Sequence, residues 1–148
     1  SHLPAVSVGD ITPNLPSVVV DDAEGSRLLA RHLHQKGYRQ ILYRRRVVLQ
    51  SANERFEAFE NEARKLQMEV REFWADIKDS VSDEEQQFLL NRREKLAIVG
   101  WEDPSARAAM QFCRAAKLRV PEDVGLAGFN GFWRFEERPS LTTIKAPW

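Results

Sequence analysis

The sequence of 148 residues is short of cysteine and of net charge. Its one cysteine, Cys113, cannot form a disulfide within the chain, which excludes a disulfide-stapled scaffold. The 22 Lys and Arg residues balance 22 Asp and Glu residues, and this argues against DNA binding by these residues, because phosphate contacts need clustered cations. No apolar run approaches the roughly 20 residues that cross a bilayer, so we expect no membrane partner.

Side-chain combinations for catalysis or metal binding are missing as well. His32 and His34 are two residues apart and would face different sides of a helix, which does not suit a shared metal. There is no glycine-rich phosphate loop and no nucleophile elbow. Glu102 and Asp103 are adjacent carboxylates, but Asp103 is better explained as a helix cap. We therefore expect no metal, no cofactor and no enzymatic activity.

Short apolar runs alternate with helix-like segments along the chain. Helix starts are indicated by Asp21-Asp22, by Asp103-Pro104, and by two capping-box spacings that begin at Ser51 and Ser82. The expected strands cover residues 6–8, 18–20, 41–43, 70–73, 96–99, 124–129 and 141–144. This order predicts an α/β fold, in which a parallel sheet is flanked by helices on both faces.

The carboxyl ends of the strands are the expected position of a ligand site in such a sheet. Polar or aromatic residues follow several of the predicted strands there. These positions are Asp21-Asp22, Arg44-Arg45-Arg46, Phe73-Trp74, Trp101-Glu102-Asp103 and Asn130-Gly131.

Several motifs occur in an order that resembles one known family. The segment from Leu118 to Phe129, LRVPEDVGLAGF, is similar to a signature of LacI/GalR-family transcriptional regulators, and PSLTTI at 139–144 resembles the family's P-x-L-T-T-V/I segment. The segment ERFEAF at 54–59 resembles the R-x-x-G-F helix start, with Ala58 in place of glycine. Upstream, the family's spacing is matched by Asp22, Gly25, Leu33, Gly37 and Ile41.

The resemblance implies a periplasmic-binding-protein-like effector domain with one lobe essentially complete. Residues 1–20 would be a remnant of the N-terminal lobe, and residues 21–145 the C-terminal lobe. The helix-turn-helix DNA-binding domain of the family would be absent from this chain. We expect residues 1–20 to be poorly ordered or to pair with another chain.

The function implied is that of a cytoplasmic, LacI-type transcriptional regulator or repressor. This chain would bind a small effector, such as a sugar, sugar acid or sugar phosphate, and form a homodimer. Operator DNA would be contacted only through the domain outside the chain. Two alternatives remain open: a periplasmic sugar-binding transport protein of the same fold, and a small α/β enzyme.

Effector-binding residues are implied by position within the family pattern. Arg55 takes the place of the effector-contacting arginine, and Asn130 that of an acidic residue that accepts ligand hydroxyls. Glu102 replaces an expected asparagine, and Trp74 lies in the region of an aromatic platform. Together with Asp22 after the second strand, these residues are the candidate effector site. The alternatives are a solvated Arg55 and a structural Glu102.

Arg44, Arg45 and Arg46 have two interpretations. As cations at the edge of a cleft, they would attract an anionic effector such as a sugar acid or sugar phosphate. As a solvated basic loop, they would be balanced by nearby glutamates.

Aromatic residues cluster after the last central strand. Phe132, Trp133 and Phe135 are too many large rings for a solvent-exposed loop, and the family uses this segment and the preceding helix for dimerisation. We expect them, with Met110 and Arg107, to contact a second subunit. The alternative is packing onto the helices of their own lobe.

Overall fold

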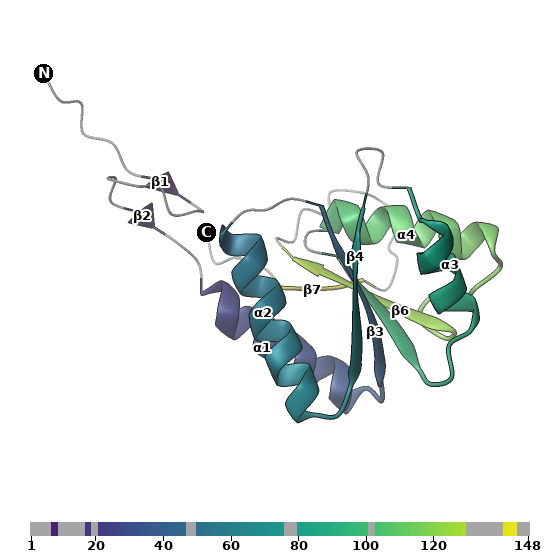
Figure 1. The fold of residues 1–148 in the computed structure, drawn as a ribbon, viewed down its shortest axis with the longest axis horizontal. Coiled ribbons are helices and arrows are strands. Elements are labelled where there is room, and N and C mark those ends of the chain that lie inside the picture. Colours follow the sequence, from purple (N-terminus) through teal and green to yellow (C-terminus); the bar gives the residue numbers. More distant parts are fainter. Residues whose placement is uncertain are drawn as a thin grey trace, which may run out of the picture.

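A computed structural model describes residues 7–8, 17–18, 21–46, 50–75, 80–100, 103–129 and 141–144. Figure 1 shows strands and helices in alternation along these segments. The helices are α1 (Asp22–Gln35), α2 (Gln50–Lys65), α3 (Asp83–Leu90) and α4 (Asp103–Ala115). The strands are β1 (Ser7–Val8), β2 (Ser17–Val18), β3 (Gln40–Arg45), β4 (Glu69–Trp74), β5 (Leu96–Gly100), β6 (Val124–Phe129) and β7 (Leu141–Ile144).

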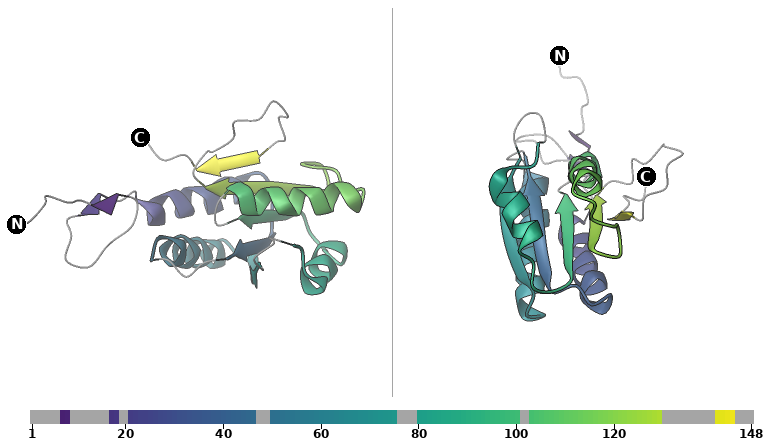
Figure 2. Two further views of the ribbon diagram at one scale, coloured as in Figure 1. Left: turned by 90° about the horizontal axis from the view of Figure 1, so that it is seen from above. Right: turned by 90° about the vertical axis from the view of Figure 1, so that its right-hand side faces the viewer.

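The central sheet has five strands in the order β4-β3-β5-β6-β7, and all neighbouring strands are parallel. Helices α1 and α2 cover one face, and α3 and α4 cover the other, as Figure 1 and Figure 2 show from three directions. The predicted fold class is therefore confirmed. Because every strand runs the same way, all carboxyl ends meet at one edge of the sheet.

Side-chain alternation along the buried strands builds two cores. In β5, Ala97 and Val99 face the core under α1 and α2, whereas Leu96 and Ile98 face the core under α3 and α4. Both faces of a central parallel strand must be apolar, which is why β5 is a continuous apolar run. In α4, Ala109, Met110 and Cys113 form an apolar stripe that is buried in the second core.

Three of the four predicted helix starts are confirmed, among them the start of α4 at Asp103, and one is wrong. The Asp21 side chain caps α1 by accepting a hydrogen bond from the Glu24 N–H at 2.9 Å, and Ser82 forms a complete capping box with Glu85. Ser51 does not cap α2, because the helix already begins at Gln50. The Gln50 side chain instead donates to Glu54 Oε1 at 2.9 Å.

Strand β3 extends further than its apolar residues predicted. It ends at Arg45, so Arg44 and Arg45 are buried parts of the sheet and not a loop after it. Within residues 1–20, the structure describes β1 and β2, which pair with each other in parallel. Pairing of this segment with another chain stays a prediction.

Candidate functional site

The carboxyl edge of the sheet brings together several of the predicted site residues. Helix α1 begins there with Asp22, β3 and β4 end there with Arg45 and Trp74, and the first turns of α2 carry Arg55. Phe129, the last residue of β6, lies on the same face. The site is therefore assembled from five elements that are distant in the sequence.

Asp22 and Arg55 form a buried ion pair. Arg55 Nε donates to Asp22 Oδ1 at 2.7 Å, and the two residues are 9% and 7% exposed. The Arg55 guanidinium also lies 5.0 Å from the centre of the Phe129 ring. Because a buried charge is tolerated only with a partner, each residue holds the other in place. The pair offers a planar donor and a carboxylate acceptor side by side.

Arg45 is held by partners from two neighbouring elements, α2 and β4. Its guanidinium donates to Glu72 Oε2 of β4 at 3.3 Å and to Asn53 Oδ1 of α2. It also lies over two rings, 4.9 Å from the centre of Phe56 and 4.7 Å from that of Trp74. We call Arg45, Glu72, Asn53, Phe56 and Trp74 the arginine clamp.

Tyr43 lies on the same face of β3 as Arg45, and reasoning from sequence did not find it as a site residue. Its ring packs edge-to-face on Phe56 with centres 5.0 Å apart, and its buried hydroxyl has no hydrogen-bond partner among the described residues. Burial raises the pKa of Tyr43, although the charges of Arg55 and Arg45 oppose this. The hydroxyl group of Tyr43 is therefore neutral. Tyr43 and Arg45 are two positions apart in a strand, so their side chains leave the same face of the sheet. This spacing is the feature of the sequence that could have identified Tyr43.

Arg44 points to the opposite face of the sheet. The expected balance by glutamates is found for Arg44 and Arg45, but neither residue is in a solvated loop. Arg44 Nε donates to Glu85 Oε1 at 2.7 Å, with side-chain exposures of 0% and 1%, and its Nη2 donates to the Ser80 carbonyl at 3.0 Å. It is neither a solvated residue nor a cation at the cleft edge, because strand alternation directs it towards α3. Arg46 follows the strand and is exposed.

Other predicted residues lie outside the site or outside the described part of the chain. Met110 is buried in the core under α3 and α4, so it packs within its own lobe and not against a second subunit. Arg107 lies in α4, and its side chain is not described. Outside the described residues lie Glu102, Asn130, Phe132, Trp133 and Phe135.

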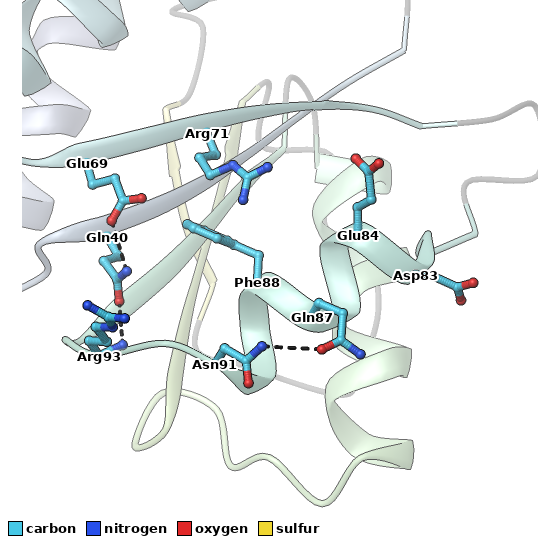
Figure 3. A pocket seen from close by; sticks show the side chains of 9 residues that line it. All are labelled: Gln40, Glu69, Arg71, Asp83, Glu84, Gln87, Phe88, Asn91 and Arg93. Carbon is cyan, nitrogen blue, oxygen red and sulfur yellow. Dashed lines mark hydrogen bonds between the residues drawn. The ribbon is translucent and has the colours of Figure 1, made fainter.

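A separate hollow of about 520 Å³ lies towards the amino ends of β3 and β4, next to α3 (Figure 3). Gln40 is fixed there, because it donates to Glu69 and accepts from the N–H groups of Arg93 and Glu94 at 2.9 Å each. The lining residues are Gln40, Glu69, Arg71, Asp83, Glu84, Gln87, Phe88, Asn91 and Arg93. None of them belongs to the predicted effector site, which is at the other end of the strands.

Within the described ranges, no three His, Cys, Asp or Glu side chains gather as they would around a metal ion. Among the same residues, no helix combines the length and apolar character needed to span a membrane.

Comparison with known proteins identifies the class. Residues 30–148 match the model of the periplasmic binding protein-like domain, and the chain belongs to this family. It is 27% identical to the HTH-type transcriptional regulator DegA of Bacillus subtilis over 99% of this chain and 45% of that protein. The chain thus spans less than half the length of this curated relative.

Solved structures support the same assignment. One is a periplasmic binding protein/LacI transcriptional regulator from Alkaliphilus metalliredigens in complex with D-xylulofuranose, with 26% identity, a TM-score of 0.80, and coverage of 98% of this chain and 56% of that one. Another is a LacI family transcriptional regulator from Bifidobacterium animalis, with 26% identity, a TM-score of 0.77, and coverage of 95% and 54%. The resemblance to LacI-type regulators is confirmed.

Proposed function

We propose that this chain is the effector-binding and dimerisation part of a LacI-type transcriptional regulator, and that a sugar binds at the carboxyl edge of the sheet. The observation that carries the proposal is the buried Asp22–Arg55 pair at that edge. Similarity to regulators supports this proposal over a transport protein or an enzyme, and a similar regulator is known with D-xylulofuranose bound.

The chemistry of the edge suits a polyhydroxylated ligand. Arginine donates hydrogen bonds in a plane, and a carboxylate accepts them. The pair can therefore donate to one hydroxyl of the ligand and accept from a neighbouring hydroxyl. Trp74, at the end of β4, offers an exposed aromatic surface for the C–H face of a sugar ring. Asn130 and Glu102 are proposed to complete the site.

Charge balance favours an uncharged sugar over a sugar acid or sugar phosphate. Arg55 is paired with Asp22 at 2.7 Å and Arg45 with Glu72 at 3.3 Å, while Arg44 is paired with Glu85 on the other face. Paired charges largely cancel each other's field at a distance, so these arginines give the edge little net attraction for anions.

The regulatory part of the proposal follows from the two-lobed architecture of the family. Ligand binding between lobes would change the geometry of a cytoplasmic homodimer, in which Phe132, Trp133, Phe135 and Arg107 contact the partner. DNA-binding domains outside this chain would then change their spacing on operator half-sites. By thermodynamic linkage, effector and operator must alter each other's affinity by the same factor.

Calorimetry on the full-length protein tests the effector site. The probes are D-xylulose, D-ribose, D-gluconate and ribose 5-phosphate, and we expect one of the uncharged sugars to bind. Arg55→Lys keeps the charge opposite Asp22 but loses the planar fork, so affinity should fall at least about tenfold, or about 1.4 kcal/mol.

Arg64→Ala provides the matched control on the same helix. Arg64 is exposed and paired with Glu60, so its loss should leave sugar affinity unchanged. Wild-type protein that binds none of the four probes would contradict the proposed function. Stronger binding of the two anions than of the two sugars would contradict the charge argument alone.

A further inference from the structure

The arginine clamp contacts a large aromatic ring that is half-exposed. Trp74 is 51% exposed although it is a large aromatic residue, and it ends the edge strand β4. Arg45 is its direct partner in the β3–β4 register, so both side chains leave the same face of the sheet. The guanidinium 4.7 Å from the ring centre gives the exposed indole a fixed support.

The clamp constrains the guanidinium through its terminal nitrogens and through ring contacts, while its buried Nε has no hydrogen-bond partner among the described residues. The guanidinium of Arg45 contacts the rings of Phe56 and Trp74. Its N–H groups donate hydrogen bonds to Glu72 and Asn53. These partners come from α2 and β4, and Arg45 itself is only 7% exposed. A planar guanidinium can stack on aromatic rings with its faces while it donates hydrogen bonds from its edge. The ammonium group of a lysine is not planar and cannot do both.

We propose that Arg45 is a positioning residue that orients Trp74 for stacking against the sugar ring. This inference rests on the proposed function, because it needs Trp74 to face the effector. The charge of Arg45 is balanced by Glu72, so its role is to hold the indole and not to attract an anion. The class of ligand favoured is an uncharged sugar that presents a C–H face to the indole.

Arg71 offers a control with the same kind of contact on the opposite face of the sheet. Its guanidinium lies 5.2 Å from the centre of Phe73 and 5.1 Å from that of Phe88. Figure 3 shows Arg71 beside Phe88 near the hollow at the amino ends of the strands. Loss of this contact removes comparable stacking without touching Trp74.

The test uses full-length wild type, Arg45→Lys, Arg45→Met, Trp74→Ala, the Arg45→Met/Trp74→Ala double variant and Arg71→Met. Calorimetry with D-xylulose and D-ribose gives affinities, and ¹H–¹⁵N NMR follows the Trp74 indole N–H, assigned by its absence in Trp74→Ala. We expect Arg45→Lys and Arg45→Met each to lower sugar affinity about tenfold and to move the indole resonance in the unliganded protein. Arg45→Met should lower affinity less than twofold once Trp74 is alanine, because coupled residues are not additive.

Several results would overturn the inference. They are an unmoved indole resonance in Arg45→Met, full affinity in Arg45→Lys, additive losses in the double variant, or an equal loss of affinity in Arg71→Met. Wild type that binds only the anions D-gluconate or ribose 5-phosphate would overturn the ligand class named here and leave the proposed function standing. Wild type that binds none of the four probes would instead show that the proposed function has failed, and the ligand role of Arg45 would fail with it.

Discussion

Neighbouring arginines in β3 have different chemistry because alternate side chains leave opposite faces of the sheet. Arg45 joins Tyr43 on the face with the candidate site, whereas Arg44 enters the interior beside α3. The same alternation sends Trp74 to one face and Phe73 to the other. Three successive arginines in a sequence therefore cannot be assigned one common role.

The Arg44–Glu85 pair makes a prediction about stability. Arg44→Leu leaves Glu85 buried and unpaired, and we expect a loss of about 3–5 kcal/mol in the free energy of unfolding. Adding Glu85→Gln removes the orphaned charge and keeps a side chain that can complete the capping box, so the double variant should recover part of the loss. Urea denaturation followed by circular dichroism measures both. A loss below about 1 kcal/mol for Arg44→Leu would contradict the buried-pair account.

Helix α3 shows how one short element connects the cap, the core and the sheet. Ser82 and Glu85 bond each other's backbone N–H groups at the helix start, and Glu85 also accepts from Arg44. Phe88 and Leu89, three and four positions after Glu85, are buried on the same side of the helix. The eight residues of α3 would form a marginal helix alone, so these contacts provide its stability.

Ser82→Ala tests the cap without removing the buried pair. The Glu85 N–H would lose its acceptor, and the free energy of unfolding should fall by about 1 kcal/mol. Ser82→Asp retains a capping oxygen and should stay close to wild type. The urea midpoint is the measurement, and an unchanged midpoint in Ser82→Ala would show that the cap contributes nothing here.

One lobe of a periplasmic-binding-protein-like fold presents only part of a ligand cleft. The chain spans 45% of DegA and 56% of the D-xylulofuranose-bound regulator, while that structure covers nearly all of this chain. The proposed effector closure and the proposed dimer are therefore tested on the full-length protein.

Trp133→Ala tests the proposed dimer. Trp133 lies in the aromatic segment at 132–135, and removing a large interface ring should raise the dimer dissociation constant at least about tenfold. Sedimentation equilibrium of wild-type and variant full-length protein provides the measurement. Wild type that is monomeric at tens of micromolar would rule the dimer out.

The sequence by itself determined the parallel α/β class, the positions of the buried strands and the Asp21 and Ser82 caps. These follow from local patterns, because apolar runs and capping residues act over a few neighbouring positions. The motifs around Pro121 and Leu141 also identified the family without a structure. The Ser51 capping box failed because the same local spacing can occur one residue inside a helix.

Only the tertiary structure decided which charges meet. Asp22 and Arg55 are 33 positions apart, Arg44 and Glu85 are 41 apart, and Arg45 binds partners on both α2 and β4. Such pairings depend on strand order, register and helix placement, which no local pattern encodes. For this reason two arginines of an apparently basic segment form ion pairs on opposite faces of the sheet. Arg44 pairs with Glu85 in the core, and Arg45 pairs with Glu72 in the clamp that supports Trp74.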